Sequence, residues 1–210
     1  MRCALEGAAV RLAPSMNAQD VANSLWALAT LGWQAGEGAM RGALEGAAVR
    51  VAPSMNAQDV ANSLWALATL GWQAVEGSMR CALEGAAVRL APSMNAQDVA
   101  NTLWALATLG WQAGEGALRS ALEGAAVRVA PCMHAQEVAN RLWALATLGW
   151  QAGEGAMRCA LEGAATRVAP SMNAQNVANT LWALATIGWQ AGVGPCGVRW
   201  RGLRCGWHRA

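Results

Sequence analysis

Apolar and polar positions along this chain follow a pattern that returns every 39 residues. A fixed period of this length is typical of repeat architectures, in which each unit buries its apolar surface only against its neighbours. A chain of 210 residues would otherwise suggest one or two globular domains. We interpret it instead as five stacked units, which span residues 1–39, 40–78, 79–117, 118–156 and 157–195.

The first part of each unit has the spacing of a short amphipathic helix. In residues 1–13, Met1, Leu5 and Leu12 fall on one arc at 100° per residue, while Arg2 and its i+4 neighbour lie together elsewhere. Pro14 cannot continue a helix. We therefore expect this helix to end before the proline.

The second part of each unit predicts a longer helix. Asn17 with Asp20 three residues later has the spacing of a capping box, and Gly32 suits the left-handed position after a helix end. Val21 and Leu25 predict the buried face between these ends. Two helices per unit at a fixed period predict an all-α fold, an α-solenoid of five tandem helix-turn-helix repeats.

Composition excludes some classes of protein. Hydrophobic residues make up 55% of the chain, but polar residues interrupt every apolar run before it could span a bilayer.

The repeats hold eleven arginines and thirteen acids, so their net charge is −2, and four further arginines in the last residues bring the chain to +2. Met1 already occupies a repeat position, so no targeting peptide is recognisable and we expect a piece of a longer array.

Residues 196–210 match no repeat. Suitable synonymous codons for "GPCGVRWRGLRCGWHRA", read two bases later, encode "AMRCALEGAAVRVAPS", the start of a further repeat. Our hypothesis is that this tail is an out-of-frame sixth repeat. Its Cys196, Cys205 and His208 would then form no metal site.

The repeats carry no recognisable catalytic group. His134 stands at the N-cap position of its unit, and the recurring acids are explained by capping and helix pairing. Cys3, Cys81 and Cys159 occupy the same place in different units, too far apart for disulfides with one another, so we expect reduced cysteines. We expect a binding scaffold that is not an enzyme and needs no cofactor, metal or small-molecule substrate.

The stretch "NAQDVANSLWALATLG" at residues 17–32 resembles the octotricopeptide repeat of algal organelle proteins. It is similar as well to the helical repeats of FAST-kinase-like and RAP-domain proteins. The resemblance covers all five units, although a proline-rich repeat start and a RAP-type domain are absent. It implies binding of organellar single-stranded RNA, with a role in RNA processing, stability or translation in a chloroplast or mitochondrion.

A polar and aromatic stripe on the second helix is the candidate RNA-binding surface. Gln19, Asn23 and Trp26 follow one another at i, i+4 and i+7. Amides can read base edges and aromatic rings can stack on bases. The full candidate set is Gln19, Asn23, Trp26, Gln58, Asn62, Trp65, Gln97, Asn101, Trp104, Gln136, Asn140, Trp143, Gln175, Asn179 and Trp182.

Structural roles for the same residues remain open at this stage. The asparagines could hydrogen-bond to one another along the solenoid, and Trp26 could belong to the core. Trp33, just past Gly32, is expected to pack back on the last helical turn.

One position differs more than the others between the near-identical units. A reader that uses one unit per base would select the base at such a position. Arg141 would then mark an odd base, by contact with a guanine or a phosphate. Drift is the alternative. The candidate specificity residues are Ser24, Ser63, Thr102, Arg141 and Thr180.

Two rows of arginine are candidate phosphate contacts, because backbone contacts supply most non-specific affinity for nucleic acids. Pairing of Arg2 with Glu6 is the structural alternative for half of them. The candidates are Arg2, Arg11, Arg41, Arg50, Arg80, Arg89, Arg119, Arg128, Arg158 and Arg167.

Sequence-selective binding of single-stranded RNA is therefore the leading hypothesis. The alternatives are a protein-interaction scaffold and a truncated fragment without function. We also expect self-association, because terminal repeats without caps expose apolar helix surface.

Overall fold

The computed structural model describes residues 2–33, 38–72, 77–111, 116–149 and 156–188. These residues form ten α-helices and no strand, in five consecutive pairs, which confirms the all-α solenoid. The first helices of the pairs are α1 (Arg2–Leu12), α3 (Ala39–Val51), α5 (Ser78–Leu90), α7 (Ala117–Val129) and α9 (Ala156–Val168). The second helices are α2 (Ala18–Thr30), α4 (Ala57–Leu70), α6 (Ala96–Leu109), α8 (Ala135–Thr147) and α10 (Ala174–Thr186).

The proline in each unit ends the first helix, as predicted. A 3-10 turn, Ala13–Ser15 in the first unit, contains Pro14 and leads into an extended residue before the second helix. In the first unit the backbone N–H of Asp20 donates to Asn17 Oδ1 at 2.9 Å, and the N–H of Asn17 donates to Asp20 Oδ2 at 3.1 Å. The predicted capping box is therefore present.

The second helix ends at glycine, also as predicted. Gly71 has a φ of 66°, and the N–H of Trp72 donates to the carbonyl of Leu67 at 3.0 Å. This arrangement satisfies carbonyls at the helix end and turns the chain back on the helix. Trp72 is 3% exposed, so the expectation that the Trp33-type residue packs on the last turn is confirmed.

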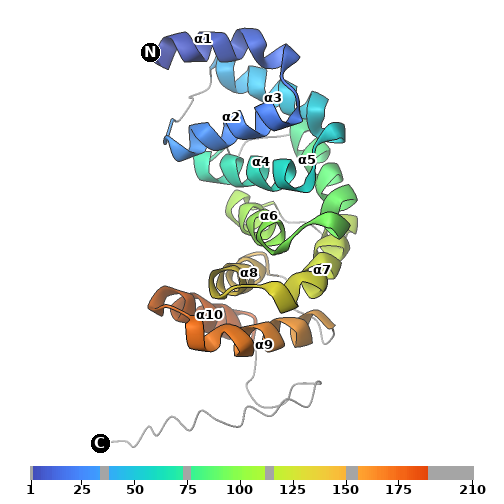
Figure 1. Ribbon diagram of the computed structural model, residues 1–210, viewed down its shortest axis with the longest axis vertical. Helices are drawn as coiled ribbons and strands as arrows, with labels where there is room; N and C mark the ends of the chain where they lie inside the picture. Colours follow the sequence, from blue (N-terminus) through green and yellow to red (C-terminus); the bar gives the residue numbers. More distant parts are fainter. Residues whose placement is uncertain (1, 34–37, 73–76, 112–115, 150–155, 189–210) are drawn as a thin grey trace, which may run out of the picture.

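The two helices of each pair form two parallel rows. Second helices pack mainly on second helices, whereas first helices pack both on neighbouring first helices and on the second helix of the preceding repeat. The array bends so that the second helices line its inner side and the first helices its outer side (Figure 1). Alanines at the contacts between second helices, such as Ala61 and Ala66 at 0% exposure, allow the inner row to pack closely.

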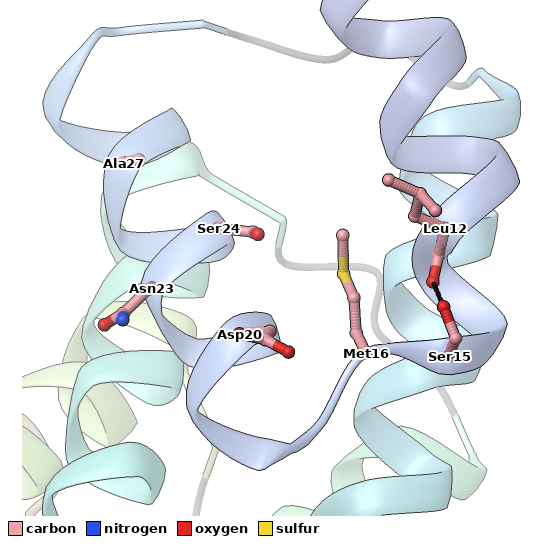
Figure 2. A pocket seen from close by; sticks show the side chains of 7 residues that line it. All are labelled: Leu12, Ser15, Met16, Asp20, Asn23, Ser24 and Ala27. Atoms are coloured by element: carbon pink, nitrogen blue, oxygen red, sulfur yellow. Dashed lines mark hydrogen bonds between the residues drawn. The ribbon is translucent and has the colours of Figure 1, made fainter.

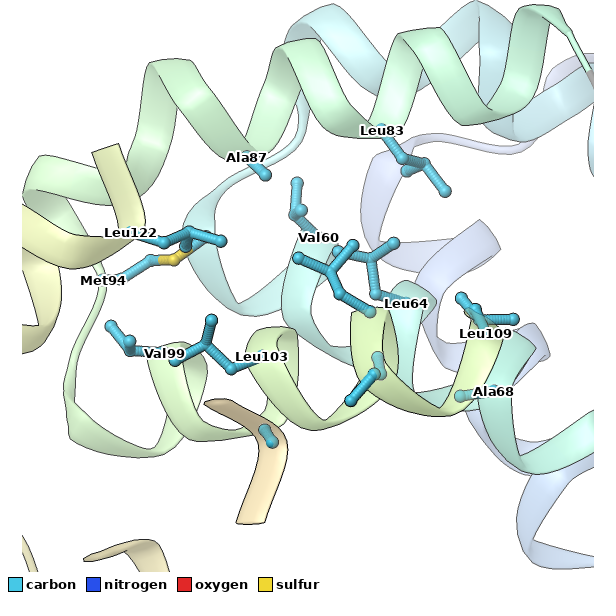
Figure 3. Close-up of a cluster of buried hydrophobic side chains, with 14 of the residues drawn as sticks. Val60, Leu64, Ala68, Leu83, Ala87, Met94, Val99, Leu103, Leu109 and Leu122 are labelled. Carbon is cyan, nitrogen blue, oxygen red and sulfur yellow. The ribbon is translucent and has the colours of Figure 1, made fainter. Parts of the chain in front are cut away.

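The core is continuous from one repeat to the next. Figure 3 shows Val60 and Leu64 of α4 facing Leu83 of α5 and Leu103 of α6. These four side chains are 0–1% exposed. Full burial of each Val or Leu contributes about 1.5–3 kcal/mol, and a repeat without neighbours would lose most of it.

Three further sequence expectations concern the tail, membrane-spanning helices and the cysteines. The tail at 196–210 lies outside the described residues. No described helix has the length and apolar character required to cross a bilayer. Cys3 and Cys81 are free, but Cys159 is a disulfide cysteine, so the expectation that the repeat cysteines are reduced is wrong at this position.

Candidate functional site

The predicted stripe forms the solvent-facing surface of each second helix. In α4 only residues 57, 58, 62, 65 and 69 escape burial. Three of them are Gln58, Asn62 and Trp65. We call these residues and their counterparts in the other repeats the inner stripe, because the second helices line the inner side of the bend (Figure 1).

The amides of the inner stripe face solvent. Every glutamine of the set, from Gln19 to Gln175, is exposed; Asn23 is exposed and the other four asparagines are half-buried. Among the described residues no hydrogen bond joins one of these asparagines to the next, so the proposed internal ladder does not form. The amide groups therefore remain available to a ligand.

The tryptophans of the inner stripe lie partly in the core and partly at the surface. Trp65, Trp104 and Trp143 are half-buried and pack against the core, whereas Trp26 and Trp182 in the end repeats are 46% and 49% exposed. The interior rings thus fix the helix spacing and still present part of their surface on the inner side. Stacking with a planar group is compatible with this geometry.

The variable position is buried, which corrects its assignment as a specificity position. Ser63, Thr102 and Arg141 are 0% exposed, Thr180 is 7% exposed and Ser24 is half-buried. Side chains in this place face the interior of the repeat, where a ligand on the inner side does not touch them. Differences between units at this position therefore concern packing.

Arg141 is an unusual core residue. Its Nη1 donates to the carbonyl of Ala126 at 3.2 Å and contacts Met133 Sδ at 3.2 Å, while Nε and Nη2 have no partner. Burial lowers the pKa of Arg141 to about 9, against the opposing attraction of Glu137. A charged group without full hydrogen bonding is costly in the core.

The first row of candidate phosphate arginines has partners within its own repeat. Arg41 Nε lies 2.7 Å from Glu45 Oε1, and its guanidinium carbon lies 5.1 Å from the centre of the Trp72 ring. Arg2, Arg80 and Arg119 make the same ion pair. Arg2 and Arg80 also lie over tryptophans, whereas the side chain of Arg158 is not among those described. Contacts of this row with phosphate stay a prediction.

The second row forms a contact that the sequence analysis missed. Nη2 of Arg50 donates to the carbonyls of Ala13 at 3.0 Å and Met16 at 2.7 Å in the preceding repeat. Arg89, Arg128 and Arg167 make the same pair of bonds one repeat further along each time. We call this contact the arginine clasp. Its sequence signal was an arginine at the same place in all five units, although the carbonyls that it binds belong to the preceding unit.

The two arginine rows lie at opposite ends of the first helices, and only the second row forms the clasp. Arg41 and Arg50 stand near opposite ends of α3, nine residues apart, which corresponds to about 14 Å along the helix. The first row lies against tryptophans that directly follow the second helices. The first row therefore pairs within its own repeat, while Arg50, Arg89, Arg128 and Arg167 of the second row join each repeat to the one before it.

His134 occupies the helix N-cap, as predicted, and its backbone N–H donates to Glu137 Oε2 at 2.7 Å. The fifth repeat has Asn176 at the capping acid's position, and its N–H donates to Asn173 Oδ1 at 2.8 Å. These acids and amides are thus explained by helix initiation.

Comparison with models of known families gives a match over most of the chain. The family model described as RNA-editing substrate-binding complex 6 protein matches residues 2–191. None of the curated proteins matches the chain. The match covers all five repeats, including the inner stripe and both arginine rows.

Proposed function

Since the chain belongs to the RNA-editing substrate-binding complex 6 protein family, we propose that it binds single-stranded RNA along the inner stripe. The observation that carries the proposal is that the interior second helices α4, α6 and α8, which line the inner side of the bend (Figure 1), leave a glutamine, an asparagine and a tryptophan unburied at the same three places. Amides and aromatic rings are the groups that hold single-stranded RNA through base edges and stacking. Our proposal is consistent with a repeat of the octotricopeptide type and with a role in RNA processing inside an organelle, chloroplast or mitochondrion.

The inner stripe also suggests what the bound sequence would be. Its glutamine, asparagine and tryptophan are the same in all five repeats. If each repeat contacts one nucleotide, identical contacts favour the same nucleotide at every step. We therefore propose a preference for a run of one base, of about five nucleotides, in place of a mixed sequence.

Phosphates would lie along the first arginine row. Arg41 and Arg80 keep 18% and 37% of their side-chain surface exposed while they pair with glutamate. An ion pair at the surface is weak, so a phosphate can compete for the guanidinium. Because few cations are free, we expect modest affinity with a small salt dependence.

A triple charge substitution on the inner stripe tests the proposal. The variant carries Gln58→Glu, Gln97→Glu and Gln136→Glu. It places three carboxylates where bases and phosphates would lie, and all three positions are exposed and outside the core. The expected result is a loss of affinity of roughly tenfold or more for labelled homopolymeric RNA in fluorescence anisotropy.

The matched control adds the same charge to the outer side. Gly46→Glu, Gly85→Glu and Gly124→Glu stand on exposed faces of first helices where an added Cβ meets no atom within 4 Å. This variant should bind within about threefold of the unchanged chain at moderate salt. Equal losses in both variants would mean that net charge, and not the inner stripe, governs binding.

A protein-binding scaffold is the second candidate. It is favoured by the net charge of −2 over the repeats and by the engagement of both arginine rows in contacts within the chain. The inner stripe would then dock a peptide through amide and aromatic contacts. Failure to bind any homopolymer in the assay above would favour this function over RNA binding.

A further inference from the structure

Exposed large hydrophobic side chains in the described part of the chain occur only in its first and last repeats. Interior repeats present none of them. The first repeat exposes Leu5, Leu12, Trp26 and Leu31, and the last repeat exposes Val177, Leu181 and Trp182. The helix pairs that carry these side chains stand at the two ends of the described array (Figure 1), and each end therefore has an apolar face that no described residue covers.

The N-terminal face is the surface that a preceding repeat covers. Leu5 is 52% exposed in the first repeat, while its counterparts Leu44 and Leu161 are 1% and 0% exposed. Leu161 belongs to the last repeat, which has a preceding neighbour in the structure. Leu31 behaves in the same way, at 60% exposure against 5% for Leu70.

The C-terminal face is the surface that a following repeat covers. Leu181 is 62% exposed in the last repeat, whereas its counterpart Leu25 in the first repeat is 0% exposed. Val177 is 41% exposed and its counterpart Val21 is 0% exposed. The two end faces are thus the two halves of the contact that joins repeats inside the chain.

A hollow on the N-terminal face supports this assignment. Figure 2 shows Met16 between α1 and α2, with Ser24 and Ala27 on the facing helix. Where a repeat precedes, the same positions are closed, and Met55 and Ala66 are 2% and 0% exposed. The hollow is therefore the vacant half of a contact that forms four times within the array.

The arginine clasp supplies a polar component to the same contact. Arg11 is exposed and holds the place that Arg50 has in the second repeat, where the clasp reaches carbonyls of the repeat before it. At the other end, the carbonyls of Ala169 and Met172 hold the places of Ala13 and Met16. Donor and acceptors of one further clasp are thus divided between the two ends.

We propose that a second copy of this chain docks head to tail, with the N-terminal face of one copy on the C-terminal face of the other. Arg11 of one copy then donates to the carbonyls of Ala169 and Met172 of the second copy, and Leu31 and Leu181 become buried. The contact joins two different surfaces, so it does not close on itself and can add further copies. This assembly goes beyond the proposed RNA binding and does not depend on it.

Two single substitutions, each blocking one face, test the proposal in the full chain. Leu31→Glu blocks the N-terminal face and Leu181→Glu blocks the C-terminal face; both residues are exposed in the single copy, so neither change affects its core. A carboxylate buried without a partner opposes the contact strongly. In sedimentation equilibrium, each variant should associate roughly hundredfold more weakly than the unchanged chain, which should form a ladder of oligomers.

Mixing the two variants distinguishes head-to-tail docking from other contacts. Each variant keeps one intact face, and these faces match, so an equimolar mixture should form dimers and nothing larger. Two outcomes overturn the proposal: an unchanged chain that stays monomeric at all concentrations, or a mixture that stays monomeric. Association of Leu181→Glu alone would overturn it as well, because it would show contact between two N-terminal faces.

The clasp gives an independent test. Arg11→Gln should weaken association about tenfold through loss of two charge-assisted hydrogen bonds. Gln97→Glu, an exposed change in the middle of the array, is the control and should leave association unchanged. Equal effects of the two substitutions would contradict a role for Arg11 in the contact.

Discussion

Replacing Arg141 with threonine should stabilise the protein. Nε and Nη2 of Arg141 are buried without a partner, and each missing hydrogen bond of a buried polar group costs about 1–3 kcal/mol. Threonine occurs at the same place in the neighbouring repeats, where Thr102 leaves one buried hydroxyl without a partner. After subtraction of that hydroxyl and of the lost contacts of the arginine stem, we expect Arg141→Thr to raise the free energy of unfolding by about 2 kcal/mol.

The stability difference between Arg141→Thr and the original chain should also depend on pH, which gives a second test of this prediction. The pKa of Arg141 is lowered to about 9 in the folded chain, below its value in the unfolded chain. Below pH 9 both states hold the proton, so the penalty is complete and constant. Above pH 9 the folded state releases the proton first, and the original chain gains about 1.4 kcal/mol per pH unit relative to the unfolded state. The advantage of Arg141→Thr should therefore shrink between pH 8 and pH 10.

Urea unfolding followed by circular dichroism at the two pH values measures both effects. Thr102→Arg is the reciprocal control, since it places the same charge in the third repeat and should destabilise by a similar amount. Unequal unfolding of the repeats would appear as a broadened transition, and hydrogen exchange in α7 and α8 would then report the local change. An Arg141→Thr chain no more stable than the original at pH 8, or a difference that does not change with pH, would refute the reasoning.

Three further substitutions should change the stability of the chain, two by raising it and one by lowering it. Ser63→Ala removes a buried hydroxyl without a partner, so it should raise the free energy of unfolding by about 1 kcal/mol and with it the thermal midpoint. The control Ser54→Ala, at an exposed position, should not raise the midpoint. Arg89→Gln removes the clasp between the second and third repeats and should cost about 2 kcal/mol in urea unfolding; a cost below that of the exposed change Gln97→Ala would count against the clasp. Asn176→Asp restores the second half of the capping box in the last repeat and should add about 0.5–1 kcal/mol, visible as slower hydrogen exchange at the start of α10, and unchanged exchange would show that the box does not form.

The periodic pattern was sufficient to predict the helices, their caps and the inner stripe. Proline, asparagine and glycine act locally, so Pro14, Asn17 and Gly32 mark helix boundaries without knowledge of the neighbours. The side of the second helix that stays exposed also follows from the spacing of Gln58, Asn62 and Trp65.

Contacts between repeats could not be predicted in the same way. Position 24 lies on the border between the exposed and buried sides, and only the packing of the preceding repeat buries its counterpart Ser63. Arg50 reads as a free surface cation in the sequence, because the carbonyls that it binds are in another unit. Misassignment of both positions has one cause, since the surface of a repeat is defined only once its neighbours are in place.

Head-to-tail docking would couple assembly to RNA binding. Because the contact between copies repeats the contact within a copy, the inner stripe of one chain would continue into that of the next. An RNA longer than the site of one copy would then bridge two copies. By linkage, the RNA would raise the affinity of one copy for the other by the same factor by which docking raises the affinity for the RNA. The mixture of Leu31→Glu and Leu181→Glu chains should therefore form dimers at lower protein concentration with a homopolymer of about ten nucleotides than with one of about five. Equal dimerisation with both lengths would mean that the inner stripes of the two copies are not continuous, even if the copies dock and RNA binds.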